Sequence, residues 1–100
     1  MKKILLICSA GMSTSLLVNK MKESAKERNI EVDIKAIPIS EAQEVVNTVD
    51  VILLGPQIRF QQKSVENMVE GNTPVLVIDM VLYGTMNGKE VLNRALDSIK

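Results

Sequence analysis

The chain of 100 residues contains no histidine, no tryptophan and a single cysteine, Cys8. One cysteine cannot form an internal disulfide or a Cys-x-x-Cys redox pair. Without histidine or a second thiol, the usual ligands of a zinc site are also missing. The only aromatic residues are Phe60 and Tyr83, too few to flank a flavin ring well. We therefore expect neither a metal nor a cofactor.

Long hydrophobic runs and an excess of one charge are also absent. The apolar run at residues 4–7 is shorter than the roughly 7–15 residues that the core of an export signal needs, and no stretch reaches the length of a membrane span. The formal net charge is zero, which argues against general nucleic-acid binding. We expect a cytosolic protein that binds anions only locally.

Apolar runs alternate with helical patterns along the whole chain. The runs expected as strands are residues 4–7, 32–36, 51–54 and 75–78. The stripes with helical spacing are Leu17, Met21 and Ala25; Ala42, Val45, Val46 and Val49; Val65, Met68 and Val69; and Val91, Leu92, Ala95, Leu96 and Ile99. This βαβαβαβα order predicts a parallel sheet with helices on both faces. The length suits one domain, spanning residues 1–100.

The composition of the runs predicts their order in the sheet. Glu31, Asp33 and Lys35 alternate with apolar residues in the second run, which is typical of an edge strand. The first and third runs are apolar throughout, as strands buried on both faces are. These features favour an α/β three-layer αβα sandwich with strand order 2-1-3-4, as in flavodoxins and low-molecular-weight tyrosine phosphatases. The fourth run would then be an apolar edge, which we expect the fourth helix or a partner to cover.

Cys8 lies where the first apolar run gives way to small and hydroxylated residues. Ser13, followed by a long stretch without glycine or proline, predicts a helix start. The thiol should therefore face a helix N-terminus, whose unpaired N–H groups and dipole favour a thiolate and a bound phosphate. The residues expected to bind that phosphate are Ser9, Ala10, Gly11, Met12, Ser13, Thr14 and Ser15.

Two further loops are expected beside the thiol. Ligands of open parallel sheets bind at the carboxyl ends of the strands where the strand order reverses, here between the first and third runs. The loops after the third and fourth runs supply a secondary or partner surface of Gly55, Pro56, Gln57, Arg59, Asp79, Tyr83 and Gly84. Plainer roles stay open: turn chemistry for the glycines, a cap for Asp79, packing for Tyr83 and a solvated charge for Arg59.

The segment that starts at Cys8 resembles the phosphate loop of low-molecular-weight tyrosine phosphatases. In that loop a cysteine and five residues precede an arginine and then a serine or threonine. Thr14 stands at the arginine position here, and Ser15 follows it. The bidentate clamp on a transferring phosphoryl group is missing, and no histidine can serve as general acid. Hydrolysis is therefore disfavoured, although a phosphocysteine can still form.

Three motifs of the chain stand out together: Ile-Leu-Leu-Ile-Cys-Ser-Ala-Gly-Met-Ser-Thr-Ser at 4–15, Leu-Gly-Pro-Gln-Ile-Arg at 54–59, and Ile-Asp with Tyr-Gly-Thr-Met-Asn-Gly within 78–88. With these motifs the whole chain resembles the IIB component of the phosphoenolpyruvate-dependent sugar phosphotransferase system (PTS), lactose/cellobiose/chitobiose class, as a type-3 IIB domain. The resemblance implies a protein-phosphohistidine–sugar phosphotransferase. Cys8 would accept a phosphoryl group from the IIA protein and pass it to a disaccharide in the membrane transporter IIC, through which alone the chain would reach the membrane.

Alternatives from other classes stay open on the residues alone. One is a hydrolase of the phosphatase or arsenate-reductase type. Another is a flavodoxin-like module, since small hydroxylated loops also hold the phosphate of FMN. A receiver-type signalling domain shares the topology, but it needs an acidic cluster and a phosphoacceptor aspartate where Cys8 and Gly55 stand.

Overall fold

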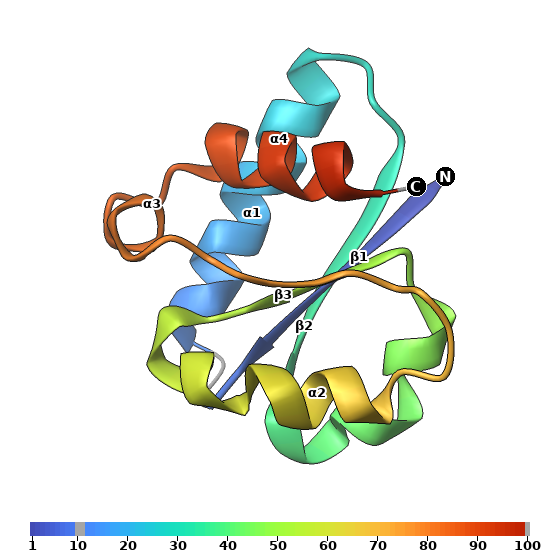
Figure 1. Ribbon diagram of the computed structural model, residues 1–100. Helices are drawn as coiled ribbons and strands as arrows, with labels where there is room; N and C mark the ends of the chain where they lie inside the picture. Colours follow the sequence, from blue (N-terminus) through green and yellow to red (C-terminus); the bar gives the residue numbers. More distant parts are fainter. Residues whose placement is uncertain (10–11, 100) are drawn as a thin grey trace.

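A computed structural model describes residues 1–9 and 12–99 of the chain, with the backbone alone for residues 12 and 13. The strands in this part of the chain are β1 (Lys2–Cys8), β2 (Val32–Pro38), β3 (Val51–Leu54) and β4 (Val75–Val77). The helices are α1 (Met12–Glu27), α2 (Gln62–Met68), α3 (Met80–Gly84) and α4 (Gly88–Ser98), with 3₁₀ segments η1 (Ile39–Glu44), η2 (Val46–Thr48) and η3 (Pro56–Gln61). All strands pair in parallel in the order β2-β1-β3-β4, so the predicted sheet is confirmed (Figure 1).

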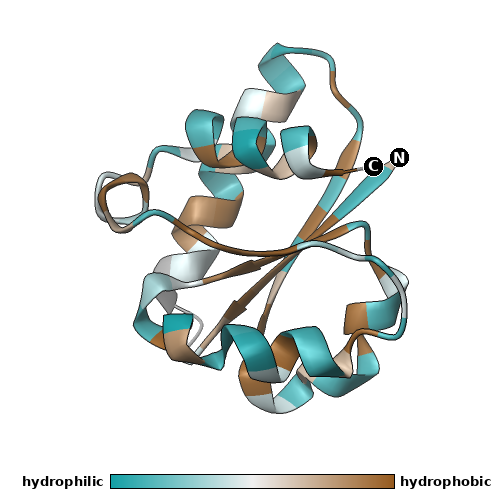
Figure 2. Cartoon of the chain, viewed as in Figure 1, coloured by the Kyte–Doolittle hydropathy of each residue, from teal (hydrophilic) through white to brown (hydrophobic). Residues whose placement is uncertain are grey.

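The sheet is covered on both faces, as the αβα prediction requires. In Figure 1, α1 and α4 lie on one side of the strands and α2 on the other. Ile4 and Leu6 of β1 pack with α1 and α4, whereas Leu5 and Ile7 pack with η1, η2 and α2. This alternation follows from the two-residue period of a strand, and it leaves the middle of β1 without exposed surface. In Figure 2 the inner part of the sheet, where β1 and β3 run side by side, is accordingly brown, that is, hydrophobic.

The prediction of an α-helix for the stripe from Ala42 to Val49 is wrong. The stripe that ends at Val49 forms η1 and η2, separated by Val45 at φ −115° and ψ −26°. Three of the four stripe residues are β-branched, which weakens an α-helix, and the Thr48 hydroxyl bonds to the Val45 carbonyl at 2.7 Å. Asn47 also turns outward, because its Oδ1 accepts from Glu70 N at 2.8 Å. The spacing still identified the buried side chains correctly, since Ala42, Val46 and Val49 lie in the core.

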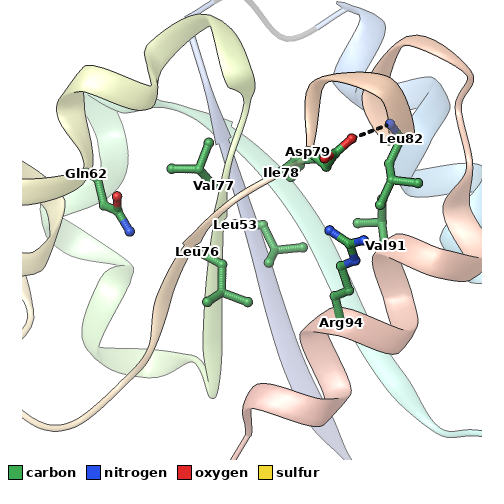
Figure 3. Close-up of a pocket in the computed structure, with 9 residues that line it drawn as sticks. All are labelled: Leu53, Gln62, Leu76, Val77, Ile78, Asp79, Leu82, Val91 and Arg94. Carbon is green, nitrogen blue, oxygen red and sulfur yellow. Dashed lines mark hydrogen bonds between the residues drawn. The ribbon is translucent and has the colours of Figure 1, made fainter.

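The apolar edge strand β4 is partly covered by the chain's own helices, with Val75 buried and Leu76 and Val77 half-buried. On one face Leu76 packs against the core formed with α1 and α4. On the other, Gln62 of α2 donates from Nε2 to the Val75 carbonyl at 2.9 Å, which occupies a backbone group that an edge strand would otherwise present. A cavity of about 260 Å³ runs along this edge between β4, α2 and α4 (Figure 3). Residues of α2 and α4 both line this cavity, so each helix shields β4 only in part.

Candidate active site

Cys8 is the last residue of the central strand β1, which pairs with β2 on one side and β3 on the other. Its side chain is 3% exposed, and Sγ lies 3.8 Å from the Ile37 carbonyl of β2, to which the thiol donates. Ser9 follows as an exposed bend, and α1 begins at Met12. Cys8 therefore lies at the carboxyl end of β1, and Figure 1 shows this end of the strand near the start of the long helix α1.

The loop after β3 meets β1 directly beside the thiol. Gly55 is buried, and its N–H donates to the Ile7 carbonyl at 2.9 Å. A side chain at Gly55 would place its Cβ 3.9 Å from the Cβ of Cys8 and 2.9 Å from Oε1 of Gln57. The loop after β3 therefore runs within van der Waals reach of Cys8, with the end of the Gln57 side chain beside it. The structure brings Cys8, Gly55 and Gln57 together, as expected from the strand order.

Arg59 is partly engaged within its own loop. Its Nη1 donates to the carbonyl of Pro56 at 3.0 Å, and Pro56 is itself buried at the start of η3. The residue as a whole is exposed. The bond to Pro56 gives Arg59 a structural role in η3, alongside the phosphate or partner contact that the sequence left open.

The segment after β4 folds into a short helix that the sequence did not predict. Asp79 caps α3, because its Oδ1 accepts from Val81 N at 2.9 Å and from Leu82 N at 3.2 Å. Figure 3 shows the second of these bonds. Tyr83 turns into the core, whereas Gly84 is exposed with open space around it. The Tyr83 hydroxyl lies 3.3 Å from the hydroxyl of Thr14 in α1. The segment after β4 therefore contacts α1, the helix that follows Cys8, through these two hydroxyls.

The cap predicts a measurable contribution to stability. Asp79→Ala removes the acceptor of two N–H groups and should lower the free energy of unfolding by about 1 kcal/mol, a typical value for a lost helix cap. Asp79→Asn keeps the oxygen and is the matched control. Urea denaturation of the two variants tests the prediction, and equal midpoints would contradict it.

The predicted phosphate-binding segment is described in part. Ala10 and Gly11 lie outside the described residues, as do the side chains of Met12 and Ser13. Thr14 is 1% exposed and directed into the core, whereas Ser15 lies on the surface. Position 14, which holds arginine in the phosphatase loop, thus carries a side chain that contacts Tyr83.

An exposed apolar set at the same edge of the sheet was not predicted from the sequence. These residues, here called the apolar rim, follow the ends of β1, β3 and β4: Leu16, Phe60, Met80 and Val81. Phe60 is 75% exposed and Val81 69%. Phe60 is excluded from every helical stripe, and Met80-Val81 continues the apolar run past the end of β4. These two signals could have revealed the rim.

The described part of the chain offers neither a metal cluster nor a membrane span. It contains no group of three or more histidine, cysteine, aspartate or glutamate residues placed to hold a metal ion. None of its helices is both long and apolar enough to cross a membrane.

Fold and site together define a doubly wound α/β domain with a thiol at the point where strand order reverses. A family model described as PTS system, Lactose/Cellobiose specific IIB subunit, matches residues 3–94. The chain is 45% identical over 97 residues to the PTS system oligo-beta-mannoside-specific EIIB component of Bacillus subtilis (strain 168), covering 96% of this chain and 94% of the relative. It is 39% identical over 100 residues to the cellobiose-specific EIIB component of Lactococcus lactis subsp. lactis (strain IL1403), covering 94% and 93%. The chain belongs to the lactose/cellobiose-specific PTS IIB family, as its motifs predicted.

Solved structures agree with this assignment. The solution structure of a cellobiose-specific phosphotransferase IIB component protein from Borrelia burgdorferi superposes with a TM-score of 0.81 at 43% identity, covering 98% of this chain and 91% of that one. The lactose-specific IIB component domain from Streptococcus pneumoniae gives a TM-score of 0.83 at 17% identity, covering 99% and 98%, and shows the shared fold alone. The protein is therefore a sugar-specific component of a phosphotransferase system. This assignment is preferred to the hydrolase, the flavin-binding module and the receiver domain that the residues alone left open.

Proposed function

We propose that Cys8 carries the phosphoryl group, from a phosphohistidine of a IIA protein to a sugar held by a IIC transporter. The observation that supports this most directly is the placement of the thiol at the end of the central strand, beside Gly55 and ahead of α1. The chain holds no second cysteine and no histidine, so no other side chain of these common nucleophilic types is available.

The proposed reaction has two displacements. In the first, the Cys8 sulfur attacks phosphorus, the S–P bond forms as the P–N bond of the phosphohistidine breaks, and the imidazole leaves with the electron pair. The thiol proton must be lost beforehand, which also ends its hydrogen bond to Ile37. In the second, a sugar hydroxyl attacks phosphorus, loses its proton and displaces the thiolate. The incoming histidine and hydroxyl belong to partners, so this chain needs no acid–base pair of its own.

Residues 9–15 are proposed to bind the equatorial oxygens of the phosphoryl group. The first N–H groups of an α-helix have no intrahelical acceptor, and α1 begins at Met12. Backbone donors from Ser9, Ala10, Gly11, Met12, Ser13, Thr14 and Ser15 would neutralise charge without a metal or cofactor. The Ser13 and Ser15 hydroxyls are further candidate donors.

A carrier must keep its intermediate from water. The buried Thr14 side chain stands where the phosphatase loop has its arginine, so this position offers no guanidinium to stabilise attack by water. We therefore propose that the protein has no hydrolytic activity of its own. Sustained, Cys8-dependent turnover of para-nitrophenyl phosphate would contradict this. We also propose that residues 1–100 form one cytoplasmic IIB domain without a nucleic-acid partner.

The experiment that tests the proposal is intact-mass analysis. The protein is incubated with phosphoenolpyruvate, the general phosphotransferase proteins and a matched IIA, and each component is omitted in turn. One phosphoryl group should be gained only when all are present. It should be lost again when membrane vesicles that contain a matched IIC and its disaccharide are added. A protein that stays unmodified with the complete mixture would refute the carrier role.

The apolar rim is proposed to be part of the surface that meets the partners, together with Gly55, Pro56, Gln57, Arg59, Asp79 and Gly84. Tyr83, which the sequence placed on the same surface, is left out because its side chain is buried in the core. Phe60→Ser should raise the half-saturating concentration of phospho-IIA about tenfold or more, because aromatic anchors dominate many interfaces. Little stability should be lost, since the side chain is already exposed. Asn72→Ser, in the exposed loop that precedes β4 at the opposite edge, is the control. Equal half-saturating concentrations would remove Phe60 from the interface.

A further inference from the structure

Tyr83 is a buried phenol whose hydroxyl reaches the first turns of α1. Its side chain is 8% exposed, and its OH lies 3.3 Å from Oγ1 of Thr14, which is 1% exposed. Burying two hydroxyls is favourable only when they find hydrogen-bond partners, and here each can serve the other. The pair joins segments that lie 69 residues apart in the sequence.

The phenol is held rigidly by its own helix. Tyr83 N donates to the Asp79 carbonyl at 2.9 Å, and Met86 N donates to the Tyr83 carbonyl at 3.1 Å. The Asp79 carboxylate fixes the start of the same helix. The Tyr83 ring lies in the same buried core as Leu17 of α1 and Leu92 of α4. Backbone and ring together set the position of the hydroxyl.

Thr14 lies in the first turn of the helix that follows Cys8. The direction of that turn decides where the free N–H groups at the start of α1 point. We propose that Tyr83 is a positioning residue for phosphoryl transfer: through Thr14 its hydroxyl fixes the first turn of α1 relative to Cys8. This rests on the proposed carrier function. Position 14 would then anchor the helix here, where the phosphatase loop uses the same position to hold the phosphoryl group directly.

The test measures single-turnover phosphorylation of Cys8 over a range of phospho-IIA concentrations, with Tyr83→Phe, Thr14→Val and the double variant. Tyr83→Phe should lower the limiting rate about tenfold, which corresponds to about one hydrogen bond, and leave the half-saturating concentration of IIA unchanged. The effects of the two single changes should be less than additive in the double variant, because both changes break the same contact. Thr14→Ser, which keeps the hydroxyl, should have a higher limiting rate than Thr14→Val, which loses it.

A second readout does not depend on transfer. The amides of Leu16 and Leu17, next to the first turn of α1, should exchange with deuterium about tenfold faster in Tyr83→Phe at equal global stability. Unchanged exchange would overturn the positioning role even if no phosphoryl transfer were detected, whereas absence of transfer in the parent protein refutes the carrier function instead.

The remaining outcomes are equally decisive. If the limiting rate of Tyr83→Phe equals that of the parent, the proposal is overturned. A raised half-saturating concentration with an unchanged limiting rate makes Tyr83 a partner contact and also overturns it. If Tyr83→Phe does not fold, Thr14→Ser and Thr14→Val carry the test, and equal limiting rates for those two would overturn it.

Discussion

Replacing Cys8 by serine is expected to abolish phosphoryl acceptance and to leave the fold intact. Serine preserves the shape of the side chain at the end of β1, with an oxygen in place of Sγ. A neutral hydroxyl is a far weaker nucleophile than a thiolate, and a serine nucleophile needs an adjacent general base. Histidine, the commonest such base, is absent from the chain. We expect the rate of phosphorylation by phospho-IIA to fall more than about a thousandfold.

Intact mass after incubation with phosphoenolpyruvate, the general phosphotransferase proteins and IIA provides the measurement. The parent should gain one phosphoryl group and Cys8→Ser none, while thermal melts of the two proteins should nearly coincide. Ser64→Ala, on the exposed surface of α2, is the control and should be phosphorylated like the parent. A serine variant that still gains the group would show that the acceptor is another residue.

Gly88→Ala is expected to destabilise the protein by about 3 kcal/mol or more, the upper end of the range for overpacking. Gly88 is buried at the start of α4, and a Cβ there would lie 2.5 Å from the backbone carbon of Lys20 and 2.6 Å from the backbone nitrogen of Met21. Backbone atoms cannot rotate away as a flexible side chain can, so α1 and α4 would have to separate. That movement would open the packing of Leu92 against α1.

Helix propensity alone predicts the opposite sign. Alanine is favoured over glycine in a helix by about 0.5–1 kcal/mol, less than the expected clash. Urea denaturation therefore distinguishes the two effects, and Gly71→Ala provides the control because a Cβ at that position would have nothing within 4 Å. That control should change the free energy of unfolding by less than about 0.5 kcal/mol. Equal stability of Gly88→Ala and the parent would show that the two helices can move apart freely.

The helix in which Gly88 lies also illustrates what spacing can predict. The stripe from Val91 to Ile99 indicated α4, and its inner residues are buried as expected. Nothing local in the sequence marked Gly88 as the point where α4 crosses α1 closely, because its partners at Lys20 and Met21 are brought there by the fold. A glycine at a helix start is also compatible with simple capping.

Some features of the candidate site could likewise be predicted from the sequence, and others could not. Cys8 at a strand end and the convergence of the loops near Gly55 follow from apolar runs and the rule for parallel sheets. The apolar rim and the Thr14–Tyr83 contact do not, since each joins residues from segments far apart in the chain. Sequence patterns report which side chains are buried against their neighbours, whereas partners across the fold depend on how the layers pack.

The sequence by itself determined the α/β class, the strand order and the position of the thiol, because apolar runs and charge alternation directly reflect burial on two faces, one face or none. Only the tertiary structure decided that residues 39–48 form 3₁₀ segments, that residues 80–84 form a helix, and that position 14 contacts Tyr83. These outcomes depend on helix caps, hydrogen bonds to other segments and packing between the layers. The free energies of these interactions are comparable to those of local helix and strand propensities, so the interactions can override the propensities.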